Sequence, residues 1–70
     1  MAEQQFRRLL RLPDVRRQVG LGRTAIYQRV KSGEFPAPIS LSNTGRAVAW
    51  DSLAIDAWIE SRIAAAGRAK

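Results

Sequence analysis

Apolar and polar positions alternate along this chain with two different periods, and the helical period comes first. Two pairs of apolar residues stand four positions apart, and both lie within the first thirty residues: Val15 with Val19, and Ile26 with Val30. Residues at i and i+4 share one face of an α-helix. The pattern therefore predicts two short amphipathic helices in succession.

Proline and glycine mark the ends of these two helices. Pro13 suits a first helical position, and Gly20 is a good residue for a left-handed helix end. Gly22 can cap the start of the second helix, and Gly33 can end it, with Pro36 sealing the stop. We therefore expect helices over residues 13–19 and 23–32, joined by a three-residue turn.

A period of two follows. "ISLS" at 39–42 and "AVAW" at 47–50 both alternate, and the turn residues "NTGR" lie between them. Pro36 and Pro38 exclude a helix just before this segment. We predict a β-hairpin over residues 39–50. "RLLRL" at 8–12 alternates more weakly and indicates a short strand or extended lead-in.

The last segment returns to helical spacing. Asp51 or Ser52 can cap it, and Gly67 is expected to stop it. Its apolar stripe consists of Leu53, Ile55, Trp58, Ile59 and Ile63.

A helix-turn-helix followed by a two-stranded hairpin and a helix is a winged helix-turn-helix, an α+β fold that is mainly helical. We expect the domain over residues 8–66, with flexible tails at 1–7 and 67–70. The expected core consists of Leu12, Val15, Val19, Leu21, Ile26, Val30, Phe35, Ile39, Leu41, Val48, Trp50, Leu53, Trp58, Ile59 and Ile63.

Charge adds the first indication of function. Twelve Lys and Arg stand against six Asp and Glu among 70 residues, and the pI is about 11.4. Residues 1–31 hold eight of the basic and two of the acidic residues, whereas residues 32–70 hold four of each. All the excess positive charge therefore lies in the first half, where it would attract a polyanion. A protein that is basic without such a partner remains the alternative.

Composition also excludes several classes of site. The chain has no Cys and no His, so it has no thiolate for zinc, no disulfide, and neither the commonest metal ligand nor the commonest general base. Asp51, Asp56 and Glu60 fit a helix cap and a solvated face better than a buried catalytic pair. We expect no enzyme activity, cofactor or metal. No apolar run approaches the ~18 residues of a membrane span, so we expect a cytoplasmic, nucleoid-associated protein.

One face of the predicted helix 23–32 is typical of DNA recognition. A helical wheel places Thr24, Gln28 and Lys31 opposite Ile26 and Val30, with Arg23 and Tyr27 on one shoulder. This outward arc of five residues contains no acidic residue. A recognition helix enters the major groove, where Gln can pair with adenine, Thr with either base edge, and Arg with guanine or a phosphate. Lys31 and Tyr27 fit phosphate contacts. A solvated face is the alternative, although such faces usually mix Glu with Lys.

Residues outside that helix are also expected to contact DNA. Arg16, Arg17 and the segment Arg7–Arg11 would bind phosphates without regard to sequence, and Asn43 could also bind a phosphate. Arg46, with Thr44 beside it, would let the hairpin grip the backbone or the minor groove; a solvated hairpin is the alternative.

Two side chains on helix 23–32 have ambiguous positions. Tyr27 could pack against the core with its hydroxyl at the rim. Arg29 falls nearer the buried face, where it could pair with Glu34 or Asp51, or hold a phosphate.

The chain resembles the AlpA-type phage regulatory proteins and their excisionase-like relatives from Arg11 to Ile63. The segments that carry the resemblance are "RLPDV", "VGLGRTAIY", "KSGEFPAPISL", "RAVAW" and "DAWIESR". The resemblance implies a MerR-like winged helix whose recognition helix begins at Arg23, Thr24 and Ala25 and whose wing arginine is Arg46. Gly22 and Ala49 replace the family's usual Ser and Gly.

The function expected from all this is site-specific binding to double-stranded DNA, as a transcriptional regulator of a prophage or mobile element. An excisionase that binds and bends attachment-site DNA uses the same contacts, so an excision assay with integrase is needed to separate the two. A module that docks an acidic protein is a more distant alternative. Expected partners are DNA and further copies of the chain on repeated sites, with integrase or RNA polymerase as candidates beyond these.

Overall fold

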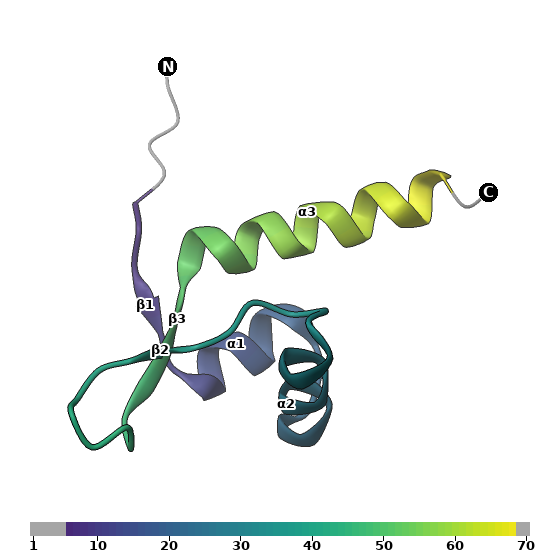
Figure 1. Ribbon diagram of the computed structural model, residues 1–70. Helices are drawn as coiled ribbons and strands as arrows, with labels where there is room; N and C mark the ends of the chain where they lie inside the picture. The colour runs from purple at the N-terminus through teal and green to yellow at the C-terminus, as the bar shows by residue number, and fades with distance from the viewer. Residues whose placement is uncertain (1–5, 69–70) are drawn as a thin grey trace.

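The computed structural model describes residues 6–68 of the 70-residue chain, and parts of both expected tails, 1–5 and 69–70, lie outside that range. The order of elements is β1 (Leu9–Leu10), α1 (Leu12–Val19), α2 (Arg23–Ser32), β2 (Ile39–Ser40), β3 (Val48–Asp51) and α3 (Ser52–Arg68). The expected winged helix-turn-helix is confirmed: α1 and α2 form the helical pair, and β2 and β3 form the hairpin. Figure 1 shows α3 along one side of the molecule and α2 and the hairpin loop on the opposite side.

The turn between α1 and α2 has the geometry that its glycines predict. Gly20 ends α1 in the left-handed region with φ of 75°, and its N–H donates to the Arg16 carbonyl. Gly33 ends α2 in the same way with φ of 85°. Gly22 caps α2 with extended backbone, where any residue fits. Helix α1 begins at Leu12, one residue before the expected start at Pro13.

The sheet has three antiparallel strands in the order β1-β3-β2. Leu10 pairs with Trp50 on one side of β3, and Ile39 pairs with Ala49 on the other. The lead-in strand is therefore an integral part of the wing sheet. Ser52 extends this pairing, since its N–H donates to the Arg8 carbonyl at 2.8 Å and its hydroxyl accepts from the Arg8 N–H at 2.7 Å.

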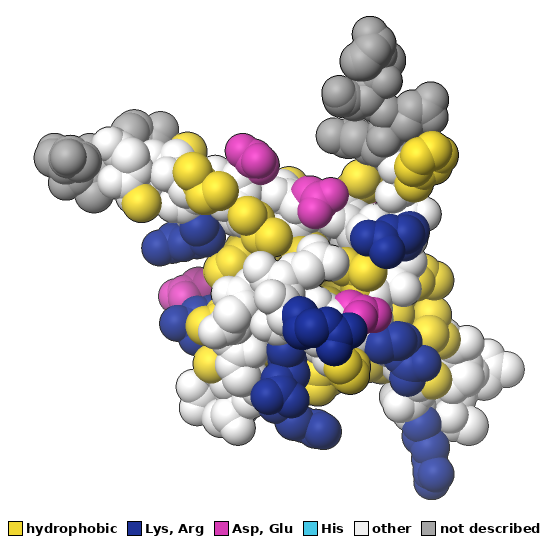
Figure 2. Space-filling model, turned by 180° about the vertical axis from the view of Figure 1, so that it is seen from behind, with side chains coloured by type: hydrophobic (Ala, Val, Ile, Leu, Met, Phe, Trp, Pro, Cys, Tyr) yellow, Lys and Arg dark blue, Asp and Glu magenta, His cyan; other side chains and the backbone are white. Residues whose placement is uncertain are grey.

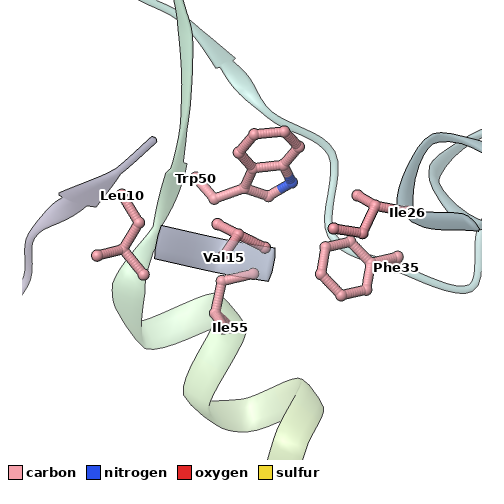
Figure 3. Packing of buried hydrophobic residues seen from close by; sticks show 6 residues of the cluster. All are labelled: Leu10, Val15, Ile26, Phe35, Trp50 and Ile55. Atoms are coloured by element: carbon pink, nitrogen blue, oxygen red, sulfur yellow. The ribbon is translucent and has the colours of Figure 1, made fainter. Parts of the chain in front are cut away.

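The core lies between the sheet and the three helices. Figure 3 shows its six side chains converging from every layer, with Val15 of α1 at the centre. They are Leu10, Val15, Ile26, Phe35, Trp50 and Ile55. Leu10 and Ile55 belong to this cluster but not to the expected core, although Ile55 was expected in the apolar stripe of the last helix. Ala49 is also fully buried and was not expected to be.

Three residues of the expected core are instead exposed. Ile39 is 46% exposed and Leu41 is 41% exposed. Ile39 pairs with Ala49, next to Trp50 in the strand, so it projects from the opposite face of the sheet, away from the helices. Ile63 is 61% exposed, because it lies in the distal half of α3, where the helix extends past the core.

The structure shows which residue caps the start of α3 and where the helix ends. Asp51 is the cap of α3, since its Oδ1 accepts a hydrogen bond from the Leu53 N–H at 3.0 Å. Ser52 is buried, and its hydroxyl bonds to the backbone of Arg8 instead. The expected stop at Gly67 is wrong: α3 runs to Arg68. Three alanines precede Gly67, and alanine is the best helix former, so the helix propagates through the glycine.

Gly33→Ala should lower the free energy of unfolding by about 1–2 kcal/mol, because an L side chain is strained at positive φ. Gly22→Ser is the matched control at the other end of α2. It should be neutral or stabilise by a few tenths of a kcal/mol by adding a capping hydroxyl. An added Cβ meets no atom within 4 Å at either glycine, so the comparison isolates the backbone. Chemical denaturation measures both, and equal effects would contradict the explanation.

Candidate nucleic-acid interface

The outer face of α2 carries the residues that the wheel selected. Ile26 is fully buried and Val30 is half-buried, which fixes the rotation of the helix about its axis. The side chains on the other side are all exposed, and none is acidic: Arg23, Thr24, Tyr27, Gln28 and Lys31. The structure therefore brings these five residues together on one basic, hydrogen-bonding surface, called here the α2 face.

Tyr27 packs against the core and still reaches the surface. Its ring packs edge-on against Trp50 with centroids 6.0 Å apart, while 36% of the residue stays exposed. The guanidinium of Arg23 lies 5.8 Å from the centroid of the same ring. Tyr27 thus joins the α2 face to the core and holds Arg23 near the start of the helix.

Arg16 and Arg17 lie close to the N-terminus of α2. They line a shallow pocket of about 410 Å³ together with Gly20, Leu21 and Gly22, the turn that leads into α2. Arg17 pairs with Asp14 one turn earlier on α1. Exposed ion pairs of this kind are weak. The Arg17 guanidinium can therefore leave Asp14 and bind another anion, such as a phosphate. The capping residue Gly22 has no side chain, so it leaves the first amides of α2 free.

Thr44 and Arg46 lie in the exposed loop between β2 and β3. Hydrogen bonds of side-chain hydroxyl groups within the loop stabilise its shape. Thr44 Oγ1 lies 3.0 Å from Ser42 Oγ, and it accepts a hydrogen bond from the Arg46 N–H at 3.3 Å. The hydroxyl of Thr44 therefore shapes the wing tip. This role of Ser42 could not be predicted from the sequence beyond the usual preference for Ser and Thr in turns.

No side-chain hydrogen bond or ion pair joins the wing tip to the α2 face within residues 6–68, but both lie on the side of the molecule opposite α3 (Figure 1). They are linked through the core, because β3 carries Trp50 against Tyr27. Figure 2 shows Lys and Arg side chains over the body from just below α3 to the lower edge, and acidic side chains both along α3 and among the basic ones at mid-height. In this view, the part of the molecule farthest from α3 shows basic side chains and no acidic ones.

Arg29 is not part of the α2 face. It is half-buried, and its Nη1 donates to the Ala25 carbonyl at 3.3 Å within the same helix. The expected pairing with Glu34 or Asp51 is wrong for the described residues: Asp51 pairs with Arg7 at 3.3 Å, and Glu34 forms no ion pair. Arg29 lines a different groove, with Glu34, Trp58 and Arg62.

The lengths and composition of the helices can also be compared with those of membrane-spanning segments. Among residues 6–68, no helix combines the length and the apolar character needed to cross a bilayer.

Comparison with known proteins agrees with this architecture. Residues 8–63 match the model of the family described as prophage CP4-57 regulatory protein (AlpA). The chain is also 44% identical over 57 residues to an uncharacterized protein, ORF88, of Enterobacteria phage P4. That match covers 81% of this chain and 62% of the phage protein, so the chain spans less than two thirds of its relative's length. The segment that matches the family model contains every described helix and strand except residues 64–68 of α3. The chain therefore belongs to the AlpA family of prophage regulatory proteins.

Proposed function

We propose that this protein is a transcriptional regulator of a prophage or related mobile element that binds double-stranded DNA at specific sites. The observation that supports this most is the α2 face: five exposed polar or basic side chains, none acidic, on a helix oriented by a glycine turn. A helix presented in this way fits the major groove of B-DNA. Membership of a regulatory family points in the same direction.

Sequence readout in this proposal belongs to the first two turns of α2. Gln28 offers the amide that pairs with adenine N6 and N7, and Thr24 offers a hydroxyl or a methyl group to a base edge. Arg23, held over the Tyr27 ring, reaches guanine or a phosphate. All three side chains are exposed, so they meet the base edges without any rearrangement of the core.

Phosphate contacts surround the readout helix. The uncapped amides at the start of α2 and its helix dipole favour an anion, and Arg16 and Arg17 lie beside them. Lys31 and the hydroxyl of Tyr27 contact phosphates of the adjacent DNA strand. The wing then adds Arg46, with Thr44, on the flanking backbone or in the minor groove.

The experiment that tests the function is selection of preferred sites from random duplex DNA by the full chain. A short sequence enriched in every round is expected. Recovery of no preferred sequence would contradict site-specific binding. One module of this size reads only a few base pairs, so the spacing and number of enriched copies are part of the result.

Gln28→Ala should remove discrimination at one base pair of the selected site, worth about 1–3 kcal/mol, and leave the other positions unchanged. Competition binding with duplexes that vary that base pair measures the loss. Gln18→Ala is the matched control, because Gln18 is an exposed glutamine on α1 outside the α2 face. An unchanged preference in the Gln28 variant would exclude the proposed docking of α2.

Arg46→Ala should make the negative slope of log K against log salt less steep by about 0.9, the value for one phosphate contact on B-DNA. Affinities at several salt concentrations, on a duplex with a single site, give the slope. Arg62→Ala removes the same charge from α3, on the opposite side of the molecule, and should leave the slope as it is. If the two variants behave alike, the wing makes no specific contribution.

A further inference from the structure

The second groove of the molecule lies away from the α2 face. It has a volume of about 550 Å³ and is lined by Val19, Leu21, Arg29, Glu34, Trp58, Ser61 and Arg62. The apolar members, Val19, Leu21 and Trp58, are half-buried and pack against the core. This surface, called here the α3 groove, is thus an apolar floor with charged residues around it.

Two arginines dominate the charge of the α3 groove. Neither Arg29 nor Arg62 forms an ion pair within residues 6–68, and Glu34 is the one acidic residue in the lining. One N–H group of the Arg29 guanidinium donates to the Ala25 carbonyl, and its other N–H groups remain available to a ligand. The groove therefore favours a ligand with an apolar side chain flanked by carboxylates.

The opposite face of α3 has that composition. Asp56, Glu60 and Ile63 follow one another at i, i+4 and i+7, so they lie in one stripe along the helix. All three are exposed, and neither carboxylate is in an ion pair in the described part of the chain. Figure 2 shows acidic side chains on the side of α3 that faces away from the body and basic side chains beneath the helix.

We propose that copies of this chain associate head to tail, with the acidic stripe of one copy (Asp56, Glu60, Ile63) docked in the α3 groove of the next. The groove and the stripe lie on different sides of α3, so each copy offers one of each. Such a heterologous contact extends into a row instead of closing a dimer. A pairing of stripe with stripe is disfavoured, because it would oppose four carboxylates.

The contact rests on the proposed function, because DNA is what brings the copies together. An exposed ion pair changes an equilibrium constant by less than about fivefold, so the contact is too weak to assemble a protein of net charge +6 in free solution. On one duplex, neighbouring copies reach an effective concentration near millimolar, where a weak contact becomes cooperativity. The α2 face and the wing stay free for DNA, since both lie on the side opposite α3.

The test compares duplexes that carry one or two copies of the selected sequence, with the spacing varied over one helical turn of about 10 bp. At a favourable spacing, the second copy of the intact chain should bind about tenfold more tightly than the first, or better. Arg62→Glu should abolish this cooperativity, and so should Asp56→Lys with Glu60→Lys. All three substitutions combined in one chain should restore it, because the charges are then exchanged.

Arg8→Glu is the control for charge, because it makes the same change on an exposed side chain outside the groove. It should weaken binding to the single site about as much as Arg62→Glu does, yet keep the cooperativity. Cooperativity that survives both charge reversals, or that appears at no spacing, would overturn the contact. If the intact chain does not bind the single site, the proposed function fails, and this assembly with it.

Disulfide trapping gives a second readout, because the natural chain has no cysteine. A mixture of Leu21→Cys and Ile63→Cys chains on the two-site duplex should form a mixed crosslink, since one residue lies in the groove and the other in the stripe. Each variant alone should crosslink far less. Equal crosslinking of Ile63→Cys with itself would overturn the head-to-tail arrangement in favour of a symmetric contact.

Discussion

Trp50 is the side chain on which the relative positions of the wing and helix α2 depend. It is fully buried in β3, and its indole N–H donates to the Pro36 carbonyl at 2.9 Å. Leu10 of β1 pairs with it across the sheet, and the ring of Tyr27 on α2 packs against it. One residue thus contacts β1, α2 and the segment that leads to the wing. A domain of this size, with no disulfide or metal to hold it, relies on such shared contacts.

A second indole repeats this arrangement at the other end of the molecule. Trp58 of α3 donates to the Glu34 carbonyl at 2.8 Å, and its ring lies 4.9 Å from that of Phe35. The segment after α2 is therefore held by Trp50 at Pro36 and by Trp58 at Glu34. These two bonds satisfy backbone carbonyls that the prolines and the glycine leave outside any helix or strand. They make an irregular connection as well defined as the elements it joins.

Local chemistry was sufficient to predict the helix-turn-helix. Gly20 and Gly33 take the positive φ that few other residues adopt without strain, so the ends of α1 and α2 could be placed from their positions alone. The spacing of Ile26 and Val30 then determined which side of α2 is buried, and the residues opposite them are exposed as expected. The composition of the α2 face followed without any knowledge of the tertiary structure.

Features that depend on distant pairing could not be predicted in this way. Alternation in "ISLS" shows that two faces differ, but not which one the helices cover, and Ile39 and Leu41 lie on the open face. Leu10 is buried because β1 pairs with β3, some forty residues later in the chain. The cap at Asp51 and the buried hydroxyl of Ser52 depend on the same pairing, because Ser52 bonds to Arg8. Arg29 was placed near the buried face correctly, but its partner is a carbonyl of its own helix and not a carboxylate.

The separation between core and α2 face has a consequence for how such a protein changes over time. Thr24, Gln28 and Lys31 are exposed and lie outside the buried cluster, so substitutions there leave the packing of the domain intact. Tyr27 is different, because the same ring supports Trp50 and Arg23. Descendants of this chain can therefore acquire new binding preferences through a few surface mutations at little cost in stability, while position 27 stays under structural constraint. Along a single helix, the fold separates positions that are free to vary from one that is held by packing.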